Sequence, residues 1–151
     1  MIRKVILPLS YNPKKGQLLM CDFSKGFESP EMTKKRPVVV IGVNEKQKLV
    51  TVVPLSTKAP HPMQDYHYLV PKRSTPQTPL FADKESWLKG NMLYTVGWKR
   101  LDRIRLGKDR NDKRTYYDQK LGPETVQQIY ICVIKGLGIN KELLSSICCV
   151  L

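Results

Sequence analysis

Two polar side chains bracket a predicted β-hairpin, and both are of types that bind phosphate. Arg36 comes shortly before a β-branched run at 38–43, and Ser56 comes shortly after a second run at 49–53. Because two such runs joined by a few polar residues form a hairpin, the start of one strand lies beside the end of the other. A guanidinium offers a planar fork of donors, and a hydroxyl adds one more. The pattern is compatible with a phosphate site, and a surface arginine with a turn serine explains the same spacing.

Other residues that could carry chemistry form no recognised catalytic or metal motif. Two carboxylates, Glu28 and Glu31, lie in the polar loop before Arg36. The chain has no nucleotide-binding glycine loop, no G-x-S-x-G and no H-E-x-x-H. Its four cysteines form no C-x-x-C and lie far from His61 and His67, which argues against a zinc site. We therefore expect free thiols and no metal ion.

The elements that must position these residues are short strands followed by a helix. The apolar and β-branched runs predict strands at 17–23, 38–43, 49–53, 67–70, 92–96 and 101–106, with a charged loop or hairpin tip at 107–114. The strands at 92–96 and 101–106 are expected to form a last pair, and Pro54 is expected at the end of the strand that begins at residue 49. A helix is predicted to begin at Pro123, with Gly122 as its cap, and a short second helix is predicted within 141–151. The order indicates a mainly β (α+β) fold, a small barrel or strongly bent sheet with the helix packed on it.

The charge of the chain favours a polyanionic partner. The 151 residues include 26 Lys and Arg against 13 Asp and Glu, a net charge of +13, and the last 31 residues hold only two of each sign. This excess fits RNA, DNA, a membrane surface or an acidic protein. No stretch reaches the roughly 20 apolar residues of a membrane helix, and the N-terminal apolar run is too short for a signal peptide. The expected location is the cytoplasm.

Several short motifs follow one another in an order that resembles a known family. They are Lys15-Gly16, Asp22-Phe23, Lys25-Gly26-Phe27-Glu28, Lys35-Arg36-Pro37-Val38-Val39-Val40, Val53-Pro54-Leu55-Ser56-Thr57, Ser86-Trp87, Thr95-Val96, Arg100-Leu101 and Leu137-Gly138. The ordered set resembles the PemK/MazF (Kid) toxins of bacterial type II toxin–antitoxin systems. The resemblance implies an SH3-like barrel of the CcdB/MazF type with a C-terminal helix over residues 14–138, with 1–13 as an N-terminal extension and 139–151 as a C-terminal tail.

The same resemblance implies an activity and partners. It implies a homodimeric, sequence-specific endoribonuclease (an mRNA interferase) that needs no metal or other cofactor and is neutralised by an acidic antitoxin protein. The ribose 2′-OH of single-stranded RNA would attack the adjacent phosphate and leave a 2′,3′-cyclic phosphate and a 5′-OH. No membrane partner is implied.

Carried over by position, the catalytic residues of the family fall on Arg36, Ser56 and Glu28. Because an arginine stays protonated, Arg36 suits stabilisation of the phosphorane rather than proton abstraction. Ser56 would donate a hydrogen bond to a phosphate oxygen, and Glu28 would accept the 2′-OH proton if its pKa were raised. A loop carboxylate that neutralises a nearby lysine is the alternative for Glu28. Further RNA contacts are expected from Thr57, Lys35, Lys89, Asn91 and His67.

Asn91 departs from the family pattern, in which an acidic residue often stands near this place. An amide orients a substrate but cannot act as a base, so the chain would be slower, use another base, or bind RNA without cutting it. His67 is an alternative base because imidazole titrates near neutrality, although a structural histidine in a strand is the simpler interpretation. Two other functions stay open: a CcdB-like toxin that poisons DNA gyrase, and a non-catalytic RNA-binding member of the family.

The densest run of charge lies between Lys99 and Arg114, where eight basic residues are interspersed with three aspartates. A solvated hairpin explains this run, and so does binding to an RNA backbone or an acidic antitoxin tail.

Overall fold

The structure is a computed structural model that describes residues 12–151, so nearly all of the predicted N-terminal extension lies outside the described residues. The strands are β1 (Leu18–Asp22), β2 (Lys35–Asn44), β3 (Leu49–Ser56), β4 (His67–Leu69), β5 (Trp87–Lys89), β6 (Tyr94–Gly97), β7 (Leu101–Asp102), β8 (Arg105–Lys108) and β9 (Arg114–Tyr116). The helices are the short η1 (Lys72–Ser74) and η2 (Trp98–Arg100), then α1 (Pro123–Gly136) and α2 (Lys141–Cys148). The fold is mainly β with C-terminal helices, as predicted.

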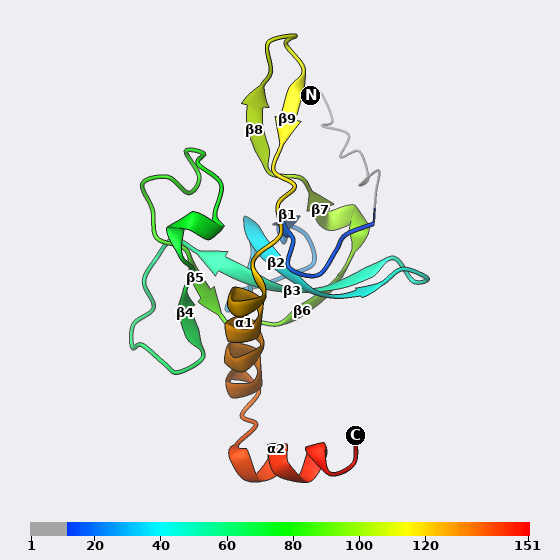
Figure 1. Cartoon of the computed structure of the whole chain (residues 1–151), viewed down its shortest axis with the longest axis vertical. Helices are drawn as coiled ribbons and strands as arrows, with labels where there is room; N and C mark the ends of the chain where they lie inside the picture. The colour runs from blue at the N-terminus through cyan, green and yellow to red at the C-terminus, as the bar shows by residue number, and fades with distance from the viewer. Residues whose placement is uncertain (1–11) are drawn as a thin grey trace.

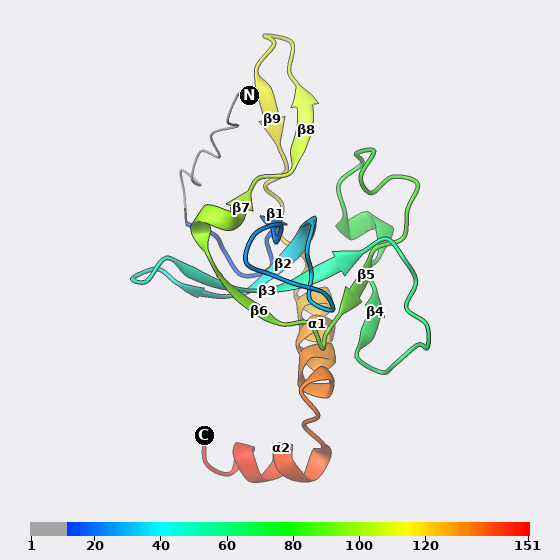
Figure 2. The ribbon, with the colours of Figure 1, turned by 180° about the vertical axis from the view of Figure 1, so that it is seen from behind.

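Seven strands form one antiparallel, strongly bent sheet (Figures 1 and 2). Their hydrogen-bonded order is β4-β5-β3-β2-β1-β7, and β6 pairs with the first half of β3. Strands β8 and β9 form a separate two-stranded hairpin that projects from the body of the molecule (Figure 1). The long strand β2 lies at the centre, between β1 and β3, and therefore carries the residues around Arg36 into the middle of the sheet.

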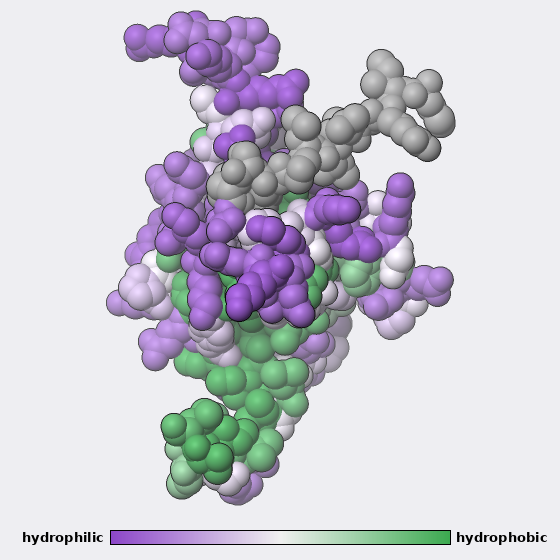
Figure 3. All heavy atoms as spheres, turned by 90° about the vertical axis from the view of Figure 1, so that its right-hand side faces the viewer, coloured by the Kyte–Doolittle hydropathy of each residue, from purple (hydrophilic) through white to green (hydrophobic). Residues whose placement is uncertain are grey.

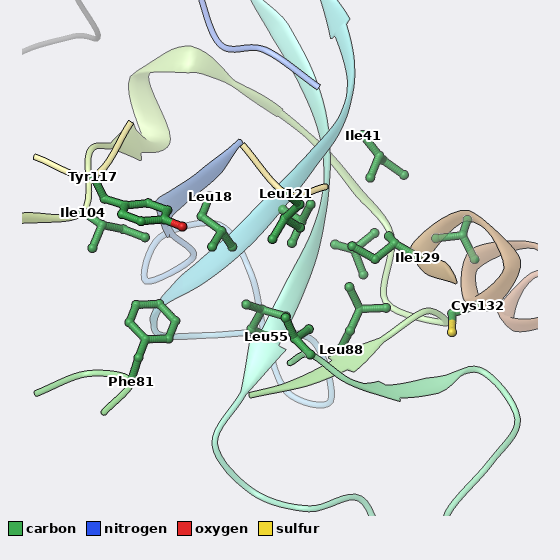
Figure 4. Close-up of a cluster of buried hydrophobic side chains, with 14 residues drawn as sticks. Leu18, Ile41, Leu55, Phe81, Leu88, Ile104, Tyr117, Leu121, Ile129 and Cys132 are labelled. Atoms are coloured by element: carbon green, nitrogen blue, oxygen red, sulfur yellow. The ribbon is translucent and has the colours of Figure 1, made fainter. Parts of the chain in front are cut away.

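Strand β2 is buried on both faces, as its uninterrupted β-branched run predicts. Val39 and Ile41 belong to a cluster that packs under α1, whereas Val38 and Val40 belong to a second cluster on the other face. Figure 4 shows the first cluster, with Ile129 of α1 beside the aliphatic side chains of the sheet. We call these two faces the helix face and the loop face, because a loop after β1 covers the second.

Helix α1 begins where local sequence predicts, with Gly122 as N-cap and Pro123 in the first position. Its close approach to the sheet depends on two glycines. A Cβ on Gly90 would collide with the carbonyl group of Cys132, and one on Gly136 would lie 2.6 Å from the carbonyl oxygen of Gly90. The backbone of α1 therefore lies directly against the backbone at the end of β5, the strand that pairs with Ser56.

Helix α2 begins at an Asn140 cap, whose side chain accepts a hydrogen bond from the Leu143 N–H at 2.8 Å. The helix extends away from the sheet (Figure 1). Apolar side chains at its end of the molecule are exposed, and Figure 3 shows hydrophobic residues gathered there and hydrophilic ones toward the hairpin. No helix within the described part of the chain is long and apolar enough to cross a membrane.

Two details of the predicted strands were wrong. The run at 101–106 does not pair with the strand at 92–96: it divides into β7, which joins β1, and β8, which joins β9. Pro54 was expected at the end of its strand but lies inside β3. It is tolerated there because β3 changes neighbours at this point, from β6 up to Val52 to β5 from Leu55 onward.

Candidate functional site

The sheet places Arg36 and Ser56 at the same end of the paired strands β2 and β3, as the hairpin pattern predicts. Val38 of β2 pairs with Pro54 of β3, and two residues further toward the same edge come Arg36 and Ser56. On its other side Arg36 pairs with Cys21 of β1, and Ser56 pairs with Trp87 of β5. Because side chains opposite each other across a sheet share a face, these four residues form one row on the loop face.

Arg36 and Ser56 offer this row hydrogen-bond donors that other protein groups leave largely unused. Arg36 is half-buried, and its Nε atom is buried without a hydrogen-bond partner among residues 12–151. Ser56 is 6% exposed, and its Oγ accepts a hydrogen bond from the Lys58 N–H at 3.2 Å, which leaves the hydroxyl proton to donate. An unpartnered buried donor costs about 1–3 kcal/mol, so an anionic oxygen brought to this row would gain both donors.

Cys21 forms the apolar floor next to Arg36. Burial raises the pKa of its thiol to about 12, an effect that the nearby Arg100 guanidinium only partly offsets. The thiolate is the reactive form of cysteine, so Cys21 stays a neutral, inert neighbour at physiological pH. The arginine is accordingly the charged group of this row.

The loop that carries Glu28 is packed onto the same face. Phe27 contacts the rings of Phe23 and Tyr94 at centroid distances of 5.3 and 5.6 Å, and the Tyr94 hydroxyl accepts a hydrogen bond from the Met32 N–H at 3.0 Å. Glu28 itself is exposed, and its N–H donates to the Glu31 carboxylate at 2.9 Å. An aromatic anchor on the loop face thus holds the backbone beside Glu28, while its carboxylate stays open to solvent.

Arg100 is an organiser of this loop that the sequence alone does not single out. Its guanidinium lies 4.8 Å from the Phe27 ring centroid. It also donates to the carbonyl oxygens of Asp22 at 3.1 Å and Lys25 at 2.7 Å. These contacts span more than 70 residues, so only the folded sheet, and not the spacing of residues, reveals them.

Lys89 and His67 lie on the loop face but further along β5. Lys89 follows Trp87 by two residues and pairs with His67 of β4. The Nδ1 atom of His67 accepts a hydrogen bond from the Gln64 N–H at 3.0 Å. Burial and the Lys89 charge lower the pKa of His67. Lys89 and His67 therefore form a separate pair on β5 and β4, and β3 lies between this pair and Arg36 on β2.

The other three expected RNA contacts are dispersed. Asn91 is exposed, with its backbone next to Gly136 near the end of α1. Lys35 alternates to the helix face, where its ammonium group lies 3.5 Å from the Asp102 carboxylate. Thr57 is exposed one residue beyond Ser56. No three His, Cys, Asp or Glu side chains within 12–151 come together in a way that would hold a metal ion.

The architecture is that of a small β-protein: a bent antiparallel sheet with a C-terminal helix, and a half-buried arginine and a buried serine on neighbouring strands. The family model described as PemK-like, MazF-like toxin of type II toxin-antitoxin system matches residues 14–131, and the chain belongs to this family.

Its relatives cover most of its length. The chain is 27% identical over 149 residues to the putative uncharacterized protein YifN of Escherichia coli K12, with 87% of this chain and 96% of that protein covered. Its fold is similar to MazF from Deinococcus radiodurans (TM-score 0.57, 14% identity, 85% of this chain and 98% of that one). It is also similar to a mycobacterial endoribonuclease in complex with its cognate antitoxin (TM-score 0.50, 17% identity, 85% and 97% covered). The MazF-type fold that the sequence predicts is thereby confirmed.

Proposed function

We propose that this chain is a sequence-specific endoribonuclease of a toxin–antitoxin system that cleaves single-stranded RNA without a metal ion. The single observation that carries the proposal is the buried, unpartnered Nε of Arg36 beside the buried hydroxyl of Ser56. Membership of the MazF-like toxin family supports it, as does the fold shared with an endoribonuclease. The net charge of +13 suits an RNA substrate.

The proposed reaction is an intramolecular transphosphorylation. The ribose 2′-oxygen attacks the adjacent phosphorus and the bond to the 5′-oxygen breaks. The leaving 5′-oxygen takes up a proton from water, so that a 2′,3′-cyclic phosphate and a 5′-OH result. Arg36 stabilises the negative charge that develops on the phosphorane oxygens, and Ser56 donates a hydrogen bond to one of them. Glu28 accepts the 2′-OH proton when RNA bound on the loop face covers the Glu28 carboxylate.

The remaining contacts follow from the layout of the loop face. Trp87 continues the row beyond Ser56 and is half-buried, so its exposed ring surface is suited to stack on an unpaired base. Lys89 and His67 lie further along this face and would hold the backbone of a neighbouring nucleotide. Thr57 and Asn91 would contact the RNA at the rim of the loop face. Lys35, at the start of β2, would contact RNA that extends past this end of the strand.

An acidic antitoxin and a second copy of the chain complete the proposed assembly. The cognate antitoxin bound to the similar mycobacterial endoribonuclease supports a protein inhibitor, and an acidic segment would be attracted by the same positive surface as RNA. We propose a homodimer that acts in the cytoplasm, where messenger RNA is found.

The test is incubation of the purified chain with an unstructured RNA in EDTA, followed by mapping of the fragment ends. Cyclic-phosphate and 5′-OH ends are expected, with a rate about 10²–10³-fold lower in Arg36→Ala. The matched control is Arg110→Ala, which removes an exposed arginine and should keep the rate. Binding without cleavage would select a non-catalytic RNA-binding protein, and intact RNA with stalled DNA gyrase would select a gyrase poison.

A further inference from the structure

A concave site lies away from the Arg36 row, at the N-terminus of α1. It is an open pocket of about 370 Å³ that includes Arg73, Ser74, Tyr117, Lys120, Glu124 and Thr125 in its lining. Tyr117 and Leu121 belong to the core cluster of the helix face, whereas Arg36 lies in a row on the loop face. The pocket is therefore separate from the proposed cleavage site.

Three chain segments meet in this pocket. Residues 73–74 come from η1, residues 117–122 join β9 to α1, and the last group belongs to the first turn of α1. The Tyr117 hydroxyl donates to the Ser74 carbonyl oxygen at 3.4 Å and links the first two segments. Figure 1 shows how the chain passes from the base of the hairpin directly into the helix. The lining is thus assembled by tertiary structure.

The first turn of α1 supplies donors that the protein leaves open. Gly122 caps this 14-residue helix without a side-chain hydrogen bond, so the N–H groups of Glu124 and Thr125 retain no intrahelical acceptor. The N-terminus of a helix also carries a partial positive charge. Independently, Thr125 is only 8% exposed and lines the pocket, and its hydroxyl has no hydrogen-bond partner among the described residues. The hydroxyl oxygen is not among the fully enclosed, unpaired side-chain atoms of residues 12–151, so it keeps contact with the pocket and can be reached by a ligand there.

The charges around the pocket select an anion. Arg73 and Lys120 are exposed at its rim, and neither side chain has an ion-pair partner within residues 12–151. Glu124 is the opposing charge, one carboxylate against two cations and the helix terminus. Backbone N–H groups, a hydroxyl and a guanidinium that line one pocket match the oxygens of a phosphate better than the two oxygens of a carboxylate.

We propose that this pocket binds the phosphate group of a nucleotide, with the N-terminus of α1, Thr125 and Arg73 as its ligands. Its volume is in the range of small-molecule sites, so the rest of the nucleotide has room beside Tyr117. The phosphate comes either from a free mononucleotide or from a nucleotide of bound RNA. The proposal does not depend on RNA cleavage, because binding is measured without turnover.

The test is a titration of the ¹⁵N-labelled full chain with inorganic phosphate, with AMP and with a short 2′-O-methyl RNA that cannot be cleaved. Each phosphate-bearing ligand that binds should shift the amide resonances of Glu124 and Thr125. Arg73→Gln and the near-isosteric Thr125→Val should weaken binding by about tenfold each, and Glu124→Gln should strengthen it. Lys141→Gln, which removes an exposed cation of α2 outside both the pocket and the hairpin, is the control.

The outcomes separate the sources and the rival occupant. Shifts with AMP and not with the oligonucleotide assign the site to a free nucleotide, and shifts with the oligonucleotide assign it to RNA. Unshifted helix-terminal resonances with all three ligands would overturn the proposal, even if Arg36-dependent cleavage were found. An acidic peptide that binds the same residues more tightly than AMP and RNA would also overturn it.

Discussion

Arg36 and the cations of the β8–β9 hairpin carry the same charge in opposite surroundings. Arg36 is half-buried in a central strand, with an Nε atom that no described group satisfies. The hairpin projects into solvent, and its aspartates are used internally. Asp109 accepts hydrogen bonds from two N–H groups of the tip, and Asp112 pairs with Lys108 at 2.7 Å. Four exposed cations remain there without an ion-pair partner in the described structure: Arg105, Arg110, Lys113 and Arg114.

This difference separates two uses of positive charge. Salt screens exposed charges over a Debye length of about 8–10 Å, so the hairpin can attract a polyanion but cannot fix the position of one phosphate. A partly buried guanidinium is screened much less, and the sheet holds it in place. The net charge of +13 therefore describes attraction, whereas the proposed cleavage depends on one arginine and its surroundings.

The largest effect expected is that of Arg36→Lys, which keeps the charge and removes the planar fork of donors. Cleavage should fall by about 10²–10³-fold, while the affinity for a non-cleavable RNA changes much less. Single-turnover rates and fluorescence anisotropy measure the two quantities. The matched control Arg114→Lys should leave both the cleavage rate and the RNA affinity unchanged. Equal losses of cleavage in the two variants would show that Arg36 has no role different from that of the hairpin cations.

The next effect in size is that of replacing the four exposed hairpin cations together by Gln. The slope of log K against log salt should become shallower by about 0.7 for each phosphate that the hairpin no longer neutralises. RNA affinity should fall most at low salt, and the cleavage rate at saturating RNA should stay unchanged. Binding titrations at several salt concentrations provide the measurement. A variant with an unaltered slope would show that the hairpin does not touch RNA.

Ser56→Ala should have a smaller effect, a decrease in cleavage rate of about tenfold, because one neutral donor is removed beside a charged one. Ser56→Thr retains the hydroxyl and should recover most of the rate. Thermal unfolding of both variants checks that the buried position still packs. An unchanged cleavage rate in Ser56→Ala would mean that the Ser56 hydroxyl takes no part in the reaction.

The smallest effect concerns the thiol beside Arg36. The pKa of Cys21 is raised to about 12 by burial, and burial also raises the pKa of Cys132. Cys148 and Cys149 are exposed. At pH 8 a thiol reagent should therefore modify two cysteines of the folded chain rapidly and all four after denaturation. Rapid labelling of Cys21 would mean that the floor of the arginine row is open to solvent.

The sequence predicted those parts of the molecule whose information is local. The β-branched runs and their polar turn predicted the β2–β3 hairpin, which the register confirms as far as Val38 and Pro54, two residues before Arg36 and Ser56. Pro123 after Gly122 predicted the start of α1. These patterns work because turn chemistry and strand periodicity act over a few residues.

Contacts between distant segments were not predictable in the same way. The pairing of β7 with β1, and the separation of β8 from it, depend on which apolar faces find each other. The hold of Arg100 on the Glu28 loop joins residues more than 70 positions apart. No spacing rule reaches across such distances, so the roles of Glu28, Lys89, Asn91 and His67 remain proposals to be tested by substitution.

By itself, the sequence determined the family, the succession of strands followed by helices, and the positions of Arg36 and Ser56 at the two ends of one hairpin. Only the tertiary structure decided that the arginine is partly buried with a free donor, that the hairpin stands apart, and that a pocket opens at the start of α1. The physical reason is that propensity and pattern belong to short segments. Burial and unsatisfied donors arise only when segments far apart in the chain exclude water together.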